Sequence, residues 1–228
     1  TRPMELSAKL VRSQLNFFKP FVANCSLEVT RKGQDKLGEL MEAIHRRDVI
    51  VRDHDFGPFQ GAWIMPKDER RQGVVLYLHG GGYTCGNLDY AKGFAATLSD
   101  ECGVRVFCAA YRLAPEDRFP AALDDAVVSY QYLLSKGYPA SQILLCGESA
   151  GGGLCAAICI RARDEGTVNV AFQMPLYPML DDRDTETSRN NHGCVWNTRR
   201  NHLAWRLYLR GTDRAQLSPY AAPARLTD

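Results

Sequence analysis

The sequence predicts an α/β fold in which a doubly wound, mostly parallel sheet carries helices on both faces. The main observation is that short apolar runs alternate with helical segments between residues 74 and 176. These runs are apolar throughout, which is typical of parallel strands that are buried on both faces. The chain also has 228 residues with 45% hydrophobic content, enough to bury one sizeable core.

The N-terminal part is expected to be helical up to about residue 45. Apolar residues recur there at spacings of three to four, which places them on one face of a helix. They are Leu6, Leu10, Leu15 and Phe18, followed by Leu37, Leu40, Met41 and Ile44. Two strands at 49–51 and 62–65 should follow as a hairpin, because Asp55, Gly57 and Pro58 between them favour turns.

The alternating part begins after this hairpin. We expect strands at 74–78, 104–110, 143–146 and 168–176, with helices at 88–98, 122–134 and 152–161. The helix at 122–134 is the clearest, since Pro120 precedes it and Gly137 can end it. After Asp181 the chain turns polar before another helical segment at 196–209, and we interpret this part as an excursion above the sheet.

Composition argues against several classes of partner. A net charge of +2 supplies no field that would hold nucleic acid or an anionic membrane surface. The apolar stretches are shorter than the roughly 20 residues that span a bilayer, so we expect no integral membrane segment. The N-terminus lacks the pattern of a signal peptide, and we therefore expect a cytoplasmic protein. The oligomeric state stays open, a homodimer included.

The eight cysteines favour buried thiols over disulfides. Cys108 and Cys146 lie in apolar strand-like runs, and Cys155 and Cys159 lie four residues apart on an expected helix. The sequence has no Cys-x-x-Cys pair and no histidine near Cys155. We therefore expect no metal site.

Ser149 is the first candidate for chemistry. It lies in the segment Gly147-Glu148-Ser149-Ala150-Gly151-Gly152, where a strand must turn sharply into a helix. The strained turn would make larger side chains collide two residues before and after the serine, and glycine occupies both places. The alternative interpretation is a glycine-rich turn with an idle serine.

A second glycine cluster, His79-Gly80-Gly81-Gly82-Tyr83, follows the strand at 74–78. Its backbone can approach a ligand closely, and the amides of Gly81 and Gly82, together with that of Ala150, are the natural donors to an oxyanion. Neither a P-loop nor a dinucleotide-binding motif matches this run. His79 could act as a base, but we assign it the role of bracing the loop.

Four segments in this order resemble the hormone-sensitive-lipase-like branch of the α/β-hydrolases. They are His79-Gly80-Gly81-Gly82, Tyr111-Arg112-Leu113-Ala114-Pro115-Glu116, Phe119-Pro120-Ala121-Ala122 and Gly147-Glu148-Ser149-Ala150-Gly151-Gly152. The resemblance implies that Ser149 is the nucleophile and that Gly81, Gly82 and Ala150 form the oxyanion hole. It also implies that residues 1–45 and 181–210 build a cap over a hydrolase core of residues 46–228. Members hydrolyse carboxylic esters of short or medium acyl chains and need no cofactor.

The chain departs from this family after Ser149. The family carries its catalytic aspartate and histidine after further strands, beyond the Ser-Pro-Tyr segment at 218–220 with which this sequence ends. We therefore expect that the last strands are missing, that the chain is truncated and that it has little activity alone. A compact triad of Asp181 with His192 or His202 is the alternative, and these three are otherwise surface residues.

Charged residues near the two glycine clusters also need an interpretation. Arg112 and Glu116 are expected to form an ion pair that orders their loop. Glu148 can tune the site electrostatically or brace the elbow, and the sequence does not choose. For the whole protein, the alternatives to an esterase are a small-molecule receptor on the same fold, an inactive remnant, and an amide or peptide hydrolase.

Overall fold

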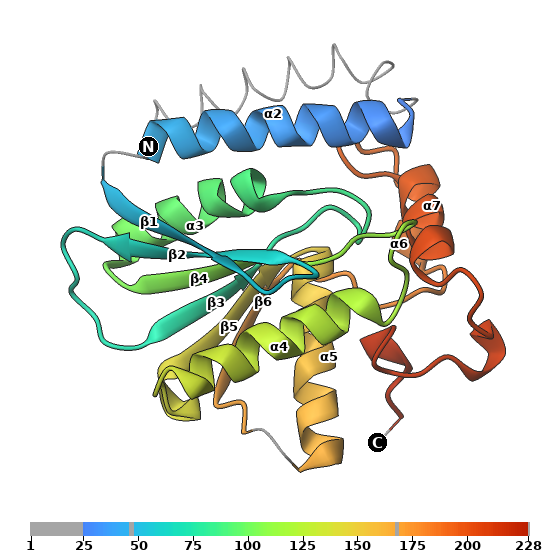
Figure 1. The fold of residues 1–228 in the computed structure, drawn as a ribbon. Coiled ribbons are helices and arrows are strands. Elements are labelled where there is room, and N and C mark those ends of the chain that lie inside the picture. Colours follow the sequence, from blue (N-terminus) through green and yellow to red (C-terminus); the bar gives the residue numbers. More distant parts are fainter. Residues whose placement is uncertain (1–24, 46–47, 167–168, 228) are drawn as a thin grey trace.

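The computed structural model describes residues 25–45, 48–166 and 169–227 (Figure 1). Its six-stranded sheet has the order β1-β2-β4-β3-β5-β6. The strands are β1 (Val49–Asp55), β2 (Gln60–Pro66), β3 (Val74–Leu78), β4 (Arg105–Ala110), β5 (Ile143–Glu148) and β6 (Phe172–Leu176). β1 and β2 form an antiparallel hairpin, β2 is antiparallel to β4, and the other neighbours are parallel. The predicted fold class is confirmed.

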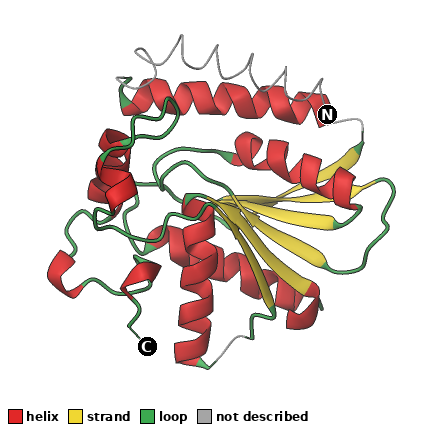
Figure 2. Ribbon diagram, turned by 180° about the vertical axis from the view of Figure 1, so that it is seen from behind, coloured by secondary structure: helices red, strands yellow, loops and turns green. Residues whose placement is uncertain are grey.

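Helices cover both faces of the sheet (Figures 1 and 2). One face carries α3 (Leu88–Cys102), and α2 (Leu27–His45) lies on top of α3. The other face carries α4 (Ala121–Ser135) and α5 (Ala150–Glu165). Two further helices follow β6, namely α6 (Glu186–Arg189) and α7 (Thr198–Tyr208). Short 3-10 turns occur at Ala140–Gln142, Arg214–Gln216 and Pro223–Arg225.

Strand β3 shows why the central runs are apolar throughout. Successive side chains of a strand point to opposite faces. Leu76 and Leu78 therefore belong to the core beneath α4 and α5, whereas Val75 and Tyr77 belong to the core beneath α3. All four are buried.

Helix ends follow local chemistry. The side chain of Asn87 accepts a hydrogen bond from the amide of Tyr90 and caps the start of α3. Gly103 ends the same helix in the left-handed conformation, with φ of 60°. The predicted glycine after α4 is also left-handed, since Gly137 has φ of 90°.

Several predicted bounds differ from the structure. The strand predicted at 168–176 begins only at Phe172, and residue 168 lies outside the described residues. The helix predicted from 152 begins at Ala150, directly after the turn. Residues 1–24, with half of the predicted N-terminal helices, also lie outside the described part. The division into a cap at 1–45 and a core at 46–228 stays a prediction.

The cysteines Cys85, Cys108, Cys146 and Cys155 are free and buried. Burial raises the pKa of the Cys108 thiol to about 12 and that of Cys155 well above its usual value. Such thiols stay protonated and unreactive at neutral pH. In the described ranges, no His, Cys, Asp or Glu side chains gather in threes to hold a metal ion. No helix in the same ranges is long and apolar enough to cross a bilayer.

Candidate active site

Ser149 lies at the sharp turn between β5 and α5. Its backbone has φ of 51° and ψ of −114°, a conformation that residues other than glycine rarely adopt. Three hydrogen bonds hold it there: its amide donates to Leu176 at 3.0 Å, and its carbonyl accepts from Met179 at 2.8 Å and Gly153 at 3.0 Å. The side chain is half-buried. A strained, well-held serine is typical of a nucleophile elbow.

The two glycines flanking Ser149 have the steric role that the sequence predicts. A Cβ at Gly151 would contact the carbonyl oxygen of Leu78 on β3. A Cβ at Gly147 would contact the backbone of Gly151 at the start of α5. Strand and helix therefore approach each other only because both positions lack side chains.

In the glycine loop, residues 79–87, hydrogen bonds to two carbonyls fix the direction of two amides. The carbonyl of Gly80 lies 2.6 Å from Nδ1 of His79. The carbonyl of Gly81 accepts from the amides of Thr84 at 3.1 Å and Cys85 at 3.0 Å. In a trans peptide the N–H points opposite to the C=O of the same unit. The amides of Gly81 and Gly82 are thus directed away from these partners.

Ala150 repeats this arrangement at the start of α5. The carbonyl in its peptide unit is that of Ser149, which is held by Met179 and Gly153. The Ala150 amide is also at a helix N-terminus, where the backbone favours negative charge. Within the described residues, the amides of Gly81, Gly82 and Ala150 have no hydrogen-bond acceptor. Together with the serine turn, they are three donors that remain available to a ligand.

His79 is fully buried behind the glycine loop. Its ring stacks on Tyr111, with centroids 4.3 Å apart and planes 7° apart, and the Tyr111 hydroxyl donates to the His79 carbonyl. Nδ1 carries the hydrogen in this arrangement, because a carbonyl oxygen can only accept. Nε2 is buried and has no partner among the described residues. These contacts are those of a brace, whereas the role itself stays a prediction.

Burial lowers the pKa of His79 below its ordinary value of 6.5. His79 is therefore neutral in the folded protein and takes up a proton more readily when unfolded. Stability is fully present above pH 6.5 and is lost as pH falls towards the lowered pKa of the folded state. We expect the free energy of unfolding to fall between about pH 7.5 and about pH 5.5 by more in the wild type than in His79→Asn. Urea denaturation at the two pH values measures this, and equal slopes would contradict it.

Glu148, directly before the serine, joins the elbow to the glycine loop. Its Oε1 accepts from the amide of Gly80 at 3.2 Å, from the Tyr77 hydroxyl at 3.1 Å and from the Tyr90 hydroxyl at 3.0 Å. Its Oε2 accepts from the hydroxyl of Tyr177 at 3.3 Å. Burial, followed by the charge of Glu148, raises the pKa of Tyr90, so the hydroxyl remains a donor. Of the two interpretations of Glu148, these contacts favour bracing.

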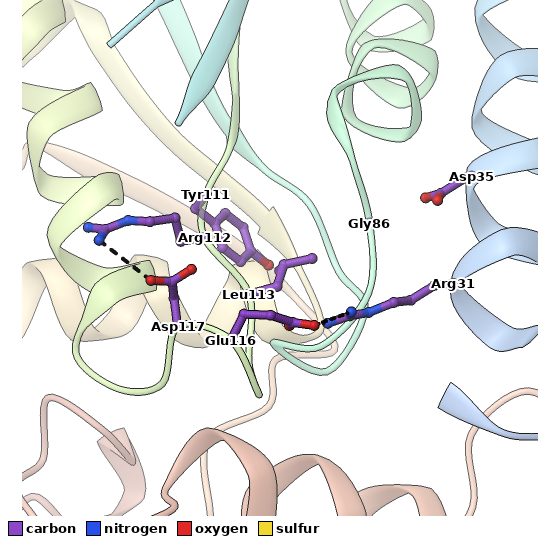
Figure 3. A pocket seen from close by; sticks show the side chains of 8 residues that line it. All are labelled: Arg31, Asp35, Gly86, Tyr111, Arg112, Leu113, Glu116 and Asp117. Carbon is purple, nitrogen blue, oxygen red and sulfur yellow. Dashed lines mark hydrogen bonds and ion pairs between the residues drawn. The ribbon is translucent and has the colours of Figure 1, made fainter. Parts of the chain in front are cut away.

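The predicted Arg112–Glu116 ion pair is wrong. Arg112 instead donates to the buried carboxylate of Asp125 on α4 at 2.8 Å. A second carboxylate, that of Asp117, lies 3.8 Å from Arg112 (Figure 3). Glu116 pairs with Arg31 on α2, at 2.8 Å. The reason is burial: the Asp125 side chain is 3% exposed and needs a charged partner, whereas Glu116 faces solvent.

We expect Arg112→Ala to lower the free energy of unfolding by about 3 kcal/mol, because it leaves the Asp125 carboxylate buried without its guanidinium. Denaturant titration measures the loss. The control is Arg118→Ala, which removes an exposed arginine whose side-chain hydrogen bond, within the described residues, goes to the carbonyl of Arg210. Its effect should stay below about 1 kcal/mol. Equal losses in the two variants would show that the Asp125 pair is not special.

The compact triad of Asp181 with His192 or His202 is not assembled. Asp181 accepts from Arg183 at 2.8 Å, and this bond, against the opposing effect of burial, keeps the pKa of Asp181 below its usual value. Nε2 of His202 lies 2.7 Å from Asp184 on the surface, and His192 is exposed. Within the described residues, no hydrogen bond joins any of the three candidates to Ser149.

The segment after β6 lies over the glycine loop. A Cβ at Gly82 would lie 2.7 Å from the ring of Trp196. Tyr83 stacks on Tyr208 of α7, with centroids 3.9 Å apart. The sequence predicts this excursion but does not predict the ion pair of Asp182 with Arg225, in which the Asp182 side chain is 2% exposed.

A cavity of about 290 Å³ is lined by residues of α2, of the glycine loop and of the segment that follows β4 (Figure 3). Its lining includes Arg31 of α2, Gly86 of the loop, and Tyr111 and Glu116. Ser149 does not line it. The sequence gives no signal for Arg31, because one arginine on an amphipathic helix looks like any solvated residue.

Known proteins share this architecture. A family model described as "alpha/beta hydrolase fold" matches residues 75–228. An acetyl-hydrolase of Streptomyces hygroscopicus is 36% identical over 197 residues, which are 85% of this chain and 62% of the relative. An ethyl acetate hydrolase of Pseudomonas putida is 32% identical over 58% of this chain and 43% of its own length. The chain thus spans less than two thirds of these relatives.

Solved structures agree with the sequence matches. A bacterial heroin esterase superposes with a TM-score of 0.77 at 32% identity, covering 91% of this chain and 70% of its own. An esterase from the bacterial hormone-sensitive lipase family superposes with a TM-score of 0.76 at 29% identity, covering 93% and 72%. The chain therefore belongs to the α/β-hydrolase family, in its hormone-sensitive-lipase-like branch.

Proposed function

We propose that this protein hydrolyses carboxylic esters, with Ser149 as the nucleophile. The observation that carries the proposal is the position of Ser149 in a strained turn, combined with three amides, of Gly81, Gly82 and Ala150, that have no acceptor among the described residues. The names of the relatives, an acetyl-hydrolase and an ethyl acetate hydrolase, favour substrates with short acyl groups.

In the proposed reaction, Oγ of Ser149 attacks the ester carbonyl carbon and loses its proton to a base. The carbonyl oxygen becomes an oxyanion, which the three amides stabilise by hydrogen bonds that need no rearrangement. The C–O bond to the alcohol then breaks, and the alcohol leaves with the proton. Water attacks the remaining acyl-enzyme in the same way and releases the acid. No cofactor enters any step.

The base is the part that the described residues do not supply. Within the described part of the chain, no hydrogen bond joins a histidine side chain to Ser149. The family resemblance implies an aspartate and a histidine on later strands, and we propose that the whole protein carries them there. The 228-residue chain alone is then expected to be nearly inactive, because a serine hydroxyl without a base is a poor nucleophile.

We further propose that residues 1–45 and 181–210 form a cap over the site. Two contacts support this: Trp196 lies against Gly82, and Arg31 of α2 reaches the glycine loop. A cytoplasmic location is also part of the proposal, since the buried free thiols of Cys85, Cys108, Cys146 and Cys155 fit a reducing compartment.

Labelling with a fluorophosphonate tests the proposal. This reagent reacts with a serine only when the hydroxyl is activated, so the whole protein should gain one phosphonyl group and Ser149→Ala should gain none. Intact mass measures both. If the wild type stays unlabelled while small esters raise its melting temperature without turnover, the receptor interpretation replaces the esterase.

A further inference from the structure

Arg31 on α2 connects this helix to the glycine loop (Figure 3). Its Nε donates to the carbonyl of Thr84 at 2.6 Å, and Nη2 donates to the carbonyl of Ala114 at 2.8 Å. Nη1 and Nη2 also donate to the two carboxylate oxygens of Glu116, at 2.9 and 2.8 Å. One guanidinium thereby holds together the helix, the glycine loop and the segment that follows β4.

Thr84 passes this restraint on to the oxyanion amides. Its own amide and its hydroxyl donate to the carbonyl of Gly81, at 3.1 and 3.2 Å. That carbonyl shares a peptide unit with the amide of Gly82. Since the unit is planar, the direction of the Gly82 N–H follows the position of Thr84. Arg31 in turn restrains Thr84 by donating a hydrogen bond to the Thr84 carbonyl.

The second hydrogen bond of Arg31, to the carbonyl of Ala114, restrains Tyr83, the residue before Thr84 in the glycine loop. The amide of Ala114 donates to the carbonyl of Tyr83 at 2.8 Å, while the Ala114 carbonyl accepts from Arg31. The residues on both sides of the Tyr83–Thr84 peptide bond are thus tied, directly or through Ala114, to one side chain on α2.

The ion pair itself is well formed but exposed. The hydrogen bond from Arg31, with its charge, holds the pKa of Glu116 at about 2, so the pair is ionised at neutral pH. The Glu116 side chain is 60% exposed, and exposed pairs add little to global stability. The effect of Arg31 should therefore be local, on the position of the turn.

We propose that Arg31 is a positioning residue that aims the Gly82 amide at the oxyanion and so couples α2 to the catalytic step. The proposal rests on the proposed esterase function. A displaced donor weakens the transition state more than the bound substrate, so kcat should change and KM should change little.

The test compares Arg31→Gln and Arg31→Lys with Lys32→Ala in the whole protein. Lys32 is the matched control, because it lies next to Arg31 on α2 and its ion pair among the described residues is with the exposed Glu28 one turn away. We expect Arg31→Gln to lower kcat for p-nitrophenyl butyrate by about 10-fold to 100-fold, below the roughly 10²-fold to 10³-fold of a lost donor. Arg31→Lys should be intermediate, since an ammonium keeps the charge but not the planar fork.

Amide hydrogen exchange supplies a readout that does not need activity. Exchange over residues 80–86 should quicken in Arg31→Gln and stay unchanged in Lys32→Ala. Unchanged exchange there, unchanged kcat, or faster exchange spread over the whole chain in both Arg31 variants would each overturn the positioning role. If the wild type shows no turnover, or if its turnover does not depend on Ser149, the esterase function is refuted. The exchange comparison would then still show whether Arg31 positions the glycine loop.

Discussion

Replacing Ser149 by alanine is expected to lower kcat for short p-nitrophenyl esters by about 10⁴-fold or more in the whole protein, because the substitution removes the Oγ on which the proposed acyl-enzyme forms. The residual rate should come from the oxyanion amides alone. Steady-state hydrolysis of p-nitrophenyl acetate and butyrate measures the change.

The fold should survive this substitution. The three backbone hydrogen bonds of residue 149 do not involve its hydroxyl. An unchanged melting temperature would therefore show that the lost rate is chemical and not structural. Turnover within tenfold of the wild type in a folded Ser149→Ala protein would mean that another residue performs the reaction.

Replacing Gly151 by alanine is expected to lower the free energy of unfolding by about 3 kcal/mol and to abolish turnover. The added Cβ would contact the carbonyl oxygen of Leu78, which is backbone of β3 and cannot rotate away. Strand β3 also leads into the glycine loop, so a shift would move the oxyanion amides away from Ser149. Denaturant titration and ester hydrolysis measure the two effects.

Gly33→Ala is the matched control, because it adds the same methyl group to a helical glycine. Among the described residues, nothing lies within 4 Å of a Cβ at Gly33, and alanine favours a helix interior by roughly 0.5–1 kcal/mol over glycine. This variant should be as stable as the wild type or more so, with unchanged turnover. A Gly151→Ala protein of wild-type stability would contradict the close approach of β3 and α5.

The sheet and the elbow could be predicted from the sequence because their signals are local. Continuous apolar runs identify buried parallel strands, and glycines two residues before and after Ser149 identify a turn without room for side chains. The directions of the Gly81 and Gly82 amides also depend on near neighbours, since the Gly80 and Gly81 carbonyls are held by His79, Thr84 and Cys85. Their role as oxyanion donors stays a prediction.

The failures concern pairs that are distant in sequence. Glu116 forms its ion pair with Arg31, which lies 85 positions earlier in the chain, and not with Arg112. Charge patterning ranks near partners first, whereas the structure pairs charges by burial, as for Asp125. The acid and base are a different case, because neither spacing nor packing identifies them among the described residues.

The most direct test of the proposed esterase function is mass spectrometry of the whole protein quenched during hydrolysis of p-nitrophenyl butyrate. The proposal predicts a butyryl group on the peptide that contains Ser149 and no such adduct in Ser149→Ala. Full turnover with no acyl group on Ser149, or with the group on another residue, would contradict it.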